Sequence, residues 1–146
     1  QIAQPRPLLL RELVAPAAVH RIELVLEAHY HGDTALCAFG PRREQLLVYR
    51  AALAPGCWEK LAEIFGAKQL IEIPEADAER YAANSFCFTR RGESFLVMPG
   101  GISDTLQGRV RERGVTPITV DVSEFLKKGG GSVKCMIGDL GPTALA

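Results

Sequence analysis

The sequence predicts an α+β fold in which a ββαβ unit is repeated along the chain. Short β-prone runs alternate with turn residues, and two helical patterns each end at a glycine. The order strand, strand, helix, strand then occurs twice, about fifty residues apart. Three pairs of residues occupy matching positions, at offsets of 51, 49 and 48: Thr34 and Ser85, Leu46 and Phe95, Leu70 and Ile118. Such units arranged about an axis form an α/β propeller, in which equivalent loops converge on a common centre.

The chain before residue 28 is expected to supply the end of an earlier unit. Residues 8–14 have a short helical pattern, and residues 21–27 alternate charged and apolar side chains as a strand does. Residues 8–27 therefore predict a helix and a closing strand.

A first complete unit is expected at residues 28–76. Its strands are predicted at 34–39, 45–49 and 69–73, after a polar loop at 28–33. A helix is predicted at 57–65 and is expected to end at Gly66. Its apolar face consists of Trp58, Leu61, Ala62 and Phe65.

A second complete unit is expected at residues 77–123, and the start of a last unit at 124–140. The second unit has predicted strands at 84–89, 93–98 and 117–121, and a helix around 103–113 that stops at Gly114. The last unit opens near Ser132. Residues 1–146 thus form one partial propeller domain of about three units.

Composition excludes several classes of partner. Seventeen Lys and Arg balance seventeen Asp and Glu, so no general basic field favours nucleic acid. No apolar run approaches the ~18 residues of a membrane span, and the first residues lack the order of a signal peptide. The sequence predicts a cytoplasmic protein that binds neither nucleic acid nor a membrane.

The four cysteines favour reduced thiols over a metal site or disulfides. They are separated by 20, 30 and 48 positions, with no C-x-x-C motif, and the chain has three histidines. No structural metal is expected. Three of the cysteines are expected to be inert and mostly buried: Cys37, Cys57 and Cys87.

The fourth cysteine, Cys135, follows the glycines at 129–131. Glycines let the backbone approach a small ligand closely, and a cysteine in the following β-prone run would present its thiol at the mouth of a strand. The alternative is a flexible turn before a core strand with a buried thiol. This stretch alone does not decide between them.

The repeat favours Cys135 as a nucleophile. Polar residues precede or enter the first strand of successive units: His31 and Asp33, Asn84, and Ser132 with its glycines. These loops are expected to meet at the axis. A thiol with a pKa near ~8.5 needs a base or positive charge beside it.

His31 is the predicted base, with His29 as its competitor. In an extended loop, Asp33 would point the same way as His31. In a strand, Lys134 would face away from Cys135.

Three motifs then carry a family resemblance. They are Tyr-His-Gly-Asp-Thr-Ala-Leu-Cys at 30–37, Ala-Ala-Asn-Ser-Phe at 82–86, and Gly-Gly-Gly-Ser-Val-Lys-Cys-Met at 129–136. Their order and spacing resemble the C-terminal half of the guanidine-modifying, or pentein, superfamily, over residues 8–140. That superfamily includes dimethylarginine dimethylaminohydrolases, arginine deiminases and dihydrolases, and amidinotransferases. The resemblance implies a ring of five ββαβ units with a catalytic cysteine on the last strand.

The resemblance also implies roles for individual residues. Cys135 would be the nucleophile, His31 the general acid and base, and Asp33 the carboxylate that holds guanidinium nitrogens. Asn84 and Ser132 are expected to bind substrate. No metal or organic cofactor is implied. Gly32 departs from the apolar residue that is common at its position and would loosen the loop.

The expected function is hydrolysis of a guanidine such as arginine, methylarginine or agmatine, through a thiouronium adduct on Cys135. A catalytically silent pentein module and an amidinotransferase are the alternatives, and the sequence does not name the substrate. An incomplete ring would leave apolar flanks exposed, so a two-fold homodimer is also expected.

Overall fold

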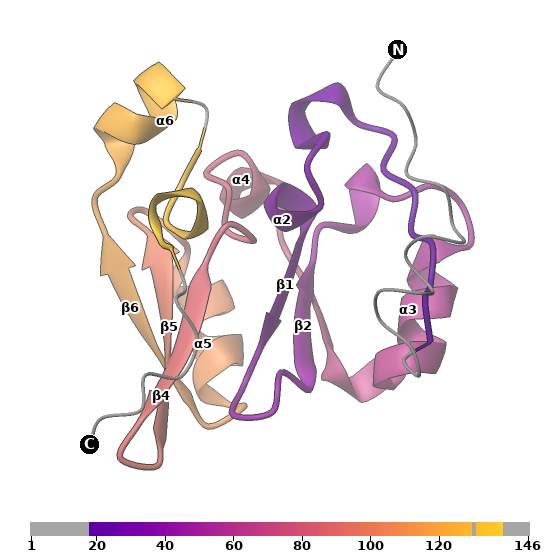
Figure 1. Cartoon of the computed structure of the whole chain (residues 1–146), viewed down its shortest axis with the longest axis horizontal. Helices are drawn as coiled ribbons and strands as arrows, with labels where there is room; N and C mark the ends of the chain where they lie inside the picture. The colour runs from indigo at the N-terminus through magenta and orange to yellow at the C-terminus, as the bar shows by residue number, and fades with distance from the viewer. Residues whose placement is uncertain (1–17, 130, 139–146) are drawn as a thin grey trace.

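The computed structural model describes residues 18–129 and 131–138. Two three-stranded sheets stand side by side, and each has two antiparallel strands followed by a parallel one (Figure 1). The α+β class and the two ββαβ units predicted from the sequence are both present.

The first sheet contains β1 (Leu36–Phe39), β2 (Gln45–Val48) and β3 (Leu70–Glu72), in that order. Helix α3 (Cys57–Phe65) connects β2 to β3. It ends at Gly66, where a φ of 90° suits glycine, as the sequence predicts. Three short 3-10 turns flank these elements: η1 (Glu27–His29), η2 (Arg50–Ala52) and η3 (Ala67–Gln69).

The second sheet contains β4 (Phe86–Arg90), β5 (Glu93–Pro99) and β6 (Val115–Val120). Helix α5 (Asp104–Arg111) connects β5 to β6. Its N-cap, Ser103, accepts a hydrogen bond from the backbone N–H of Leu106 and donates its hydroxyl to Asp77 at 2.6 Å. Asp77 lies on α4 (Glu75–Ala78), so this contact fixes the start of α5 against the helix that follows β3.

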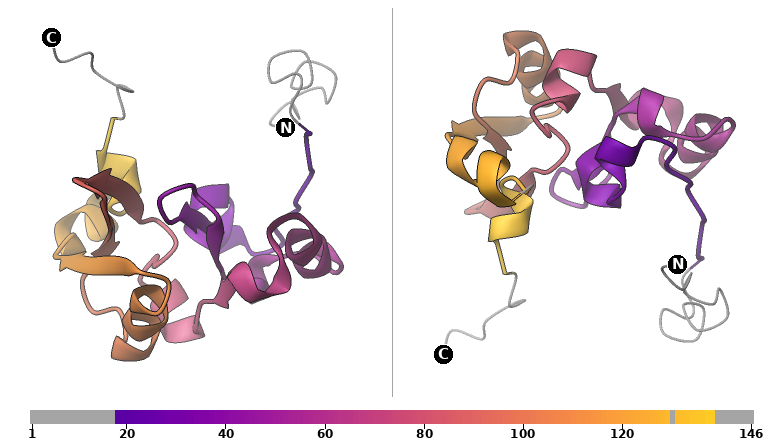
Figure 2. Two further views of the ribbon diagram at one scale, coloured as in Figure 1. Left: turned by 90° about the horizontal axis from the view of Figure 1, so that it is seen from below. Right: turned by 90° about the horizontal axis from the view of Figure 1, so that it is seen from above.

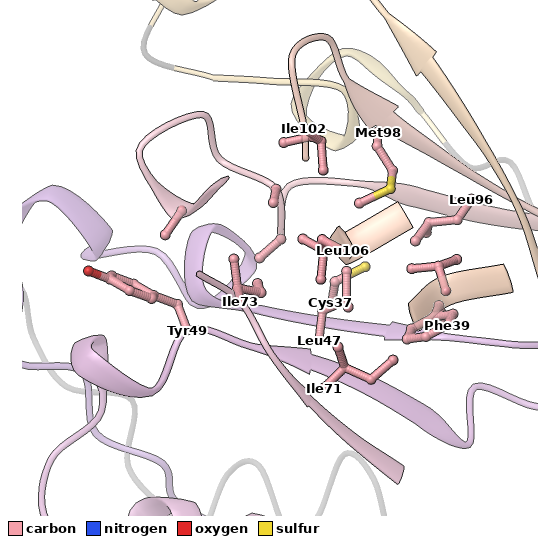
Figure 3. Packing of buried hydrophobic residues seen from close by; sticks show 14 of the residues in the cluster. Cys37, Phe39, Leu47, Tyr49, Ile71, Ile73, Leu96, Met98, Ile102 and Leu106 are labelled. Carbon is pink, nitrogen blue, oxygen red and sulfur yellow. The ribbon is translucent and has the colours of Figure 1, made fainter. Parts of the chain in front are cut away.

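The main hydrophobic core lies between the two sheets. Helix α5 contributes Leu106 to it, with Cys37 and Leu47 from the first sheet and Leu96 and Met98 from the second (Figure 3). A second cluster lies on the other face of the first sheet, under α3. Figure 2 shows α3 on the side of the first sheet that faces away from the second sheet. Both faces of the first sheet are therefore covered.

The helices reveal which residues of the two units correspond. Helix α3 packs on Leu46 and Val48, whereas α5 packs with Leu96 and Met98. Leu46 therefore lies on the helix-covered face of its strand, as Leu96 does. Because side chains alternate along a strand, Phe95 lies on the opposite face, so the predicted match of Leu46 with Phe95 joins residues on different faces.

Two predicted strands are not formed. Residues 21–27 make one isolated bridge, between Leu24 and Leu53, and then enter η1. Residues after Gly131 form the 3-10 turn η4 (Lys134–Met136), so Cys135 is not on a strand among the described residues. This tight turn brings Gly131 close to Cys135. The predicted helix at 8–14 lies outside the described residues.

Two short helices complete the structure. Helix α2 (Gly32–Ala35) replaces the start of the first predicted strand, and α6 (Ser123–Gly129) leads toward η4. Both α6 and η4 lie at one end of the second sheet (Figure 1). Among the described residues, no helix is long and apolar enough to cross a membrane.

Candidate active site

The side chain of Asn84 connects the three motifs. It is fully buried just before β4, and its Oδ1 accepts hydrogen bonds from the backbone N–H of Ser132, at 3.2 Å, and of Cys135, at 3.3 Å. Its Nδ2 lies 3.2 Å from Cys135 Sγ and donates to the Asp33 carbonyl at 3.4 Å. The convergence of loops expected from the repeat is therefore present for these residues.

Cys135 is exposed and free, whereas Cys37 and Cys87 are buried. A Cβ built on Gly131 would lie 2.9 Å from the Cβ of Cys135 and 3.4 Å from its Sγ. A side chain does not fit there without displacing Cys135. The absence of a side chain at Gly131 therefore allows a close approach, as the sequence predicts, but the group that lies close to Gly131 is the Cys135 side chain.

Ser132 lies beneath the cysteine turn. Its side chain is fully buried, and its hydroxyl has no hydrogen-bond partner within the part of the chain that the structure describes. Asn84 and Ser132 expose no surface to a substrate in this conformation. Their predicted role in substrate binding stays a prediction.

His31 precedes α2 and is exposed. Its carbonyl accepts hydrogen bonds from the backbone N–H of Thr34, at 3.0 Å, and from the Thr34 hydroxyl, at 2.7 Å. The loop is thus helical rather than extended, and the argument that His31 and Asp33 point the same way for that reason does not hold. No hydrogen bond among residues 18–129 and 131–138 joins the His31 ring to Cys135.

Asp33 is half-buried and lines a cavity of about 430 Å³ between β1 and β4. Lys134 and Arg43 line the same cavity, together with Ile137. The prediction that Lys134 faces away from the site fails because Lys134 lies in a 3-10 turn rather than a strand. Arg43 was not predicted, and an exposed turn sequence gives no signal for it. Its guanidinium donates to the Cys87 carbonyl at 2.6 Å.

Cys37 also lines this cavity but is chemically unlike Cys135. Burial raises the pKa of the Cys37 thiol to about 12, although the positive charge of Lys134 acts in the opposite direction. Its Sγ contacts the carbonyl of Ser85 at 3.5 Å. Cys37 therefore stays a neutral thiol near pH 7, as expected for a core cysteine. Cys57, at the start of α3, is only half-buried.

The described residues contain no cluster of three or more His, Cys, Asp or Glu side chains that could hold a metal ion. What the site does contain is an exposed thiol, a carboxylate on a cavity wall and two cations beside it. Such groups suit covalent chemistry on a small polar molecule.

Comparison with known proteins identifies the family. Residues 59–141 match the family described as N,N dimethylarginine dimethylhydrolase, eukaryotic. The chain belongs to this family. The match includes both Asn84 and Cys135, while His31 and Asp33 precede it.

Individual members and solved structures agree with this family. The chain is 31% identical over 121 residues to N(G),N(G)-dimethylarginine dimethylaminohydrolase of Mycobacterium tuberculosis. It superposes with a TM-score of 0.68 and 27% identity on ArgZ, an arginine dihydrolase of the ornithine–ammonia cycle in cyanobacteria, covering 79% of this chain and 17% of that one. The same scores relate it to the N-terminal domain of an ArgZ variant covalently bound to a reaction intermediate. The pentein superfamily and fold predicted from the sequence are confirmed.

The chain is shorter than these relatives. The mycobacterial match includes 83% of this chain but only 37% of the mycobacterial protein. The superposition covers 39% of the ArgZ N-terminal domain. The chain therefore spans well under half the length of these relatives.

Proposed function

We propose that this chain carries the cysteine-containing part of a hydrolase that cleaves the guanidine group of arginine or a methylated arginine. The observation that carries the proposal is the exposed Cys135 thiol, which Asn84 holds next to the segment that bears Asp33. Family membership supports the substrate class, because the relatives are named for dimethylarginine and arginine.

The proposed reaction passes through a covalent adduct. The Cys135 thiolate attacks the central guanidinium carbon, while the Asp33 carboxylate pairs with the guanidinium nitrogens and orients the planar cation. His31 protonates the departing amine as its bond to carbon breaks, which leaves a thiouronium on Cys135. His31 then takes a proton from a water that attacks the adduct carbon, and the thiolate leaves. The ArgZ domain trapped with a covalent intermediate supports this course.

In this mechanism His31 must approach the adduct. Its exposed position before α2 leaves it free to do so when substrate fills the cavity that Asp33 lines. No cofactor takes part in these steps.

A guanidine-mimicking electrophile tests the proposal without requiring turnover. We expect a chloroacetamidine to label the chain once, at Cys135, and we expect the variant Cys135→Ser to be unlabelled. Cys37→Ser and Cys87→Ser are matched controls that should retain full labelling, because both thiols are buried. Labelling that persists in Cys135→Ser would contradict the proposal.

Labelling also separates the remaining possibilities. A chain that binds a guanidine reversibly but is not labelled would act as a silent module. A chain that is labelled, and whose arginine adduct is released faster when an amine acceptor is added, would be an amidinotransferase rather than a hydrolase.

A further inference from the structure

The four hydrogen-bonding positions of the Asn84 side chain are all used within the protein. Oδ1 faces two backbone N–H groups, which can only donate, so the amide oxygen must point toward Ser132 and Cys135. Nδ2 then points toward the Asp33 carbonyl and the Cys135 sulfur, with one hydrogen for each. The orientation of the amide is fixed by its partners, and none of its positions is left for substrate.

The backbone of Asn84 adds a further anchor. Its carbonyl accepts a hydrogen bond from the Lys134 N–H at 3.1 Å. One buried residue thus holds three backbone N–H groups of the cysteine turn, those of Ser132, Lys134 and Cys135, and joins them to the segment at Asp33. The Asn84 side chain itself is fully buried, and its bond to the Ser132 N–H lies out of water, where water does not compete for it.

We infer that Asn84 is a positioning residue: Oδ1 fixes the turn that carries Cys135, and the Nδ2 donor stabilises the thiolate. A role of Asn84 in catalysis rests on the proposed function. The effect of Asn84 on ionisation of the Cys135 thiol can be measured without any guanidine. A sulfur anion accepts a hydrogen bond more strongly than a neutral thiol does, so a donor at 3.2 Å favours the charged form.

The influence of charged groups near the cysteine turn must be separated from that of the amide. Lys134 precedes Cys135 in the turn, and Arg43 and Asp33 lie on the wall of the cavity that Lys134 also lines. His31, immediately before α2, is a further titratable residue of the site. The Cys37 thiol stays neutral. None of these groups changes when Asn84 is replaced by a side chain of the same shape.

The variant Asn84→Asp is the most informative replacement. An aspartate keeps an oxygen for the Ser132 and Cys135 N–H groups, so the turn remains anchored. It also replaces the Nδ2 donor by a negatively charged oxygen that faces the sulfur. Asn84→Ala removes both functions, and comparing the two variants separates anchoring from donation.

The measurement is the rate of iodoacetamide alkylation of Cys135 as a function of pH, resolved from the other cysteines by peptide mass spectrometry. We expect Asn84→Asp to move the midpoint upward by at least one pH unit, so that the rate at pH 7 falls about tenfold or more. The limiting rate at high pH should be unchanged. Gln107→Glu makes the same amide-to-acid change on α5 and should leave the profile as in the wild type. An unshifted profile in Asn84→Asp would overturn the inference.

A second measurement needs no variant. Asn84 is the only asparagine in the sequence, so labelling with ¹⁵N-asparagine gives one side-chain amide group in an NMR spectrum. We expect its two proton resonances to move with pH at the midpoint of the alkylation profile, and to shift when Cys135 is alkylated. Resonances that shift neither with pH nor on alkylation of Cys135 would overturn the inference, even if Asn84→Asp fails to fold.

These experiments fail separately from the proposed function. If the chain does not act on guanidines, chloroacetamidine fails to label the wild type, whereas the iodoacetamide profile and the amide resonances still report the contact between Asn84 and Cys135. If Asn84 has no influence on the thiol, guanidine-dependent labelling persists and the profile does not move.

Discussion

The imidazole Nδ1 of His29 lies 3.1 Å from the carbonyl oxygen of Thr34, across the turn that carries His31. The His29 ring is 5% exposed and packs against Tyr49 and Tyr81, with centroids 4.9 and 5.7 Å away. His31, two residues later, is exposed and contacts the ring of Tyr30. Two histidines separated by one residue therefore have different environments: His29 is buried and bonded to the loop, and His31 remains accessible.

This difference predicts opposite effects of two alanine substitutions. His31→Ala should lower guanidine turnover by about 10²–10⁴-fold, the usual contribution of a general acid or base, and leave the unfolding midpoint nearly unchanged. His29→Ala should instead lower the free energy of unfolding by about 1–3 kcal/mol, because it leaves a buried carbonyl without its partner. Steady-state kinetics and urea unfolding check both. If His29→Ala impairs turnover more than His31→Ala without unfolding the chain, the wrong histidine has been chosen as the base.

Gly131 gives a prediction about the geometry of the thiol. Gly131→Ala would place a methyl group 2.9 Å from Cys135 Cβ, which is too close for either atom to remain in place. We expect labelling of Cys135 by a chloroacetamidine to slow at least tenfold. Gly129→Ala is the matched control, since nothing lies within 4 Å of a Cβ there. Equal labelling of the two variants would show that the position of the turn does not matter.

The buried thiol of Cys37 predicts a dependence of stability on alkaline pH. Its pKa is about 12 in the folded chain, against a value of 9.0 for an unperturbed thiol. Between these values the unfolded chain releases a proton that the folded chain retains, so stability falls as pH rises, by up to about 1.4 kcal/mol per pH unit. Below pH 9 the effect is absent.

The comparison that isolates this thiol is wild type against Cys37→Ala, because lysines and tyrosines that titrate in the same range cancel in the difference. Urea unfolding at pH 8, 9, 10 and 11 should show a stability difference that shrinks as pH rises. A difference that stays constant over this range would mean that Cys37 ionises as easily in the folded chain as in the unfolded one.

The fold could be predicted largely because its signals are local. The glycine after α3 ends that helix where expected, and the strand runs at 45–49 and 93–98 contain β2 and nearly all of β5. The errors came where tertiary contacts override local pattern. Residues 21–27 alternate like a strand, but within the described part of the chain they form one isolated bridge, between Leu24 and Leu53. The match of Leu46 with Phe95 failed because spacing alone does not reveal which face a helix covers.

The site could be predicted only in part. Motif order correctly indicated that the segments of Asp33, Asn84 and Cys135 meet, since the repeat brings equivalent loops together. The role of Asn84 could not be seen, because a polar residue before a strand looks the same whether it faces a ligand or a backbone. The segment at Cys135 is predicted as a strand because Val133 and Ile137 are β-prone, whereas the close approach of Gly131 to Cys135 in the turn is not visible in sequence.

One surface of the second sheet predicts self-association. The face of β4, β5 and β6 that points away from α5 bears Phe86, Phe88, Phe95, Val97 and Ile118. The rings of Phe88 and Phe95 are stacked at 5.2 Å, and all five side chains are at least partly exposed. The first sheet has no such face, because α3 covers one side and the main core the other. Exposed apolar area costs about 25 cal/mol per Å², and a continuous patch of this kind is typical of an interface.

We therefore expect the 146-residue chain to form a homodimer in which this face is covered by the same face of a second copy, related by a two-fold axis. Sedimentation equilibrium at micromolar concentration should give about twice the chain mass of 15.9 kDa. Ile118→Glu, which changes a side chain that is 39% exposed on this face, should shift the equilibrium to monomer. Ile64→Glu is the matched control, because Ile64 is 41% exposed but lies on α3, outside the face. If Ile64→Glu dissociates the dimer and Ile118→Glu does not, the two copies associate through α3 instead. A wild-type chain that is monomeric and folded would show that the aromatic face needs no second copy.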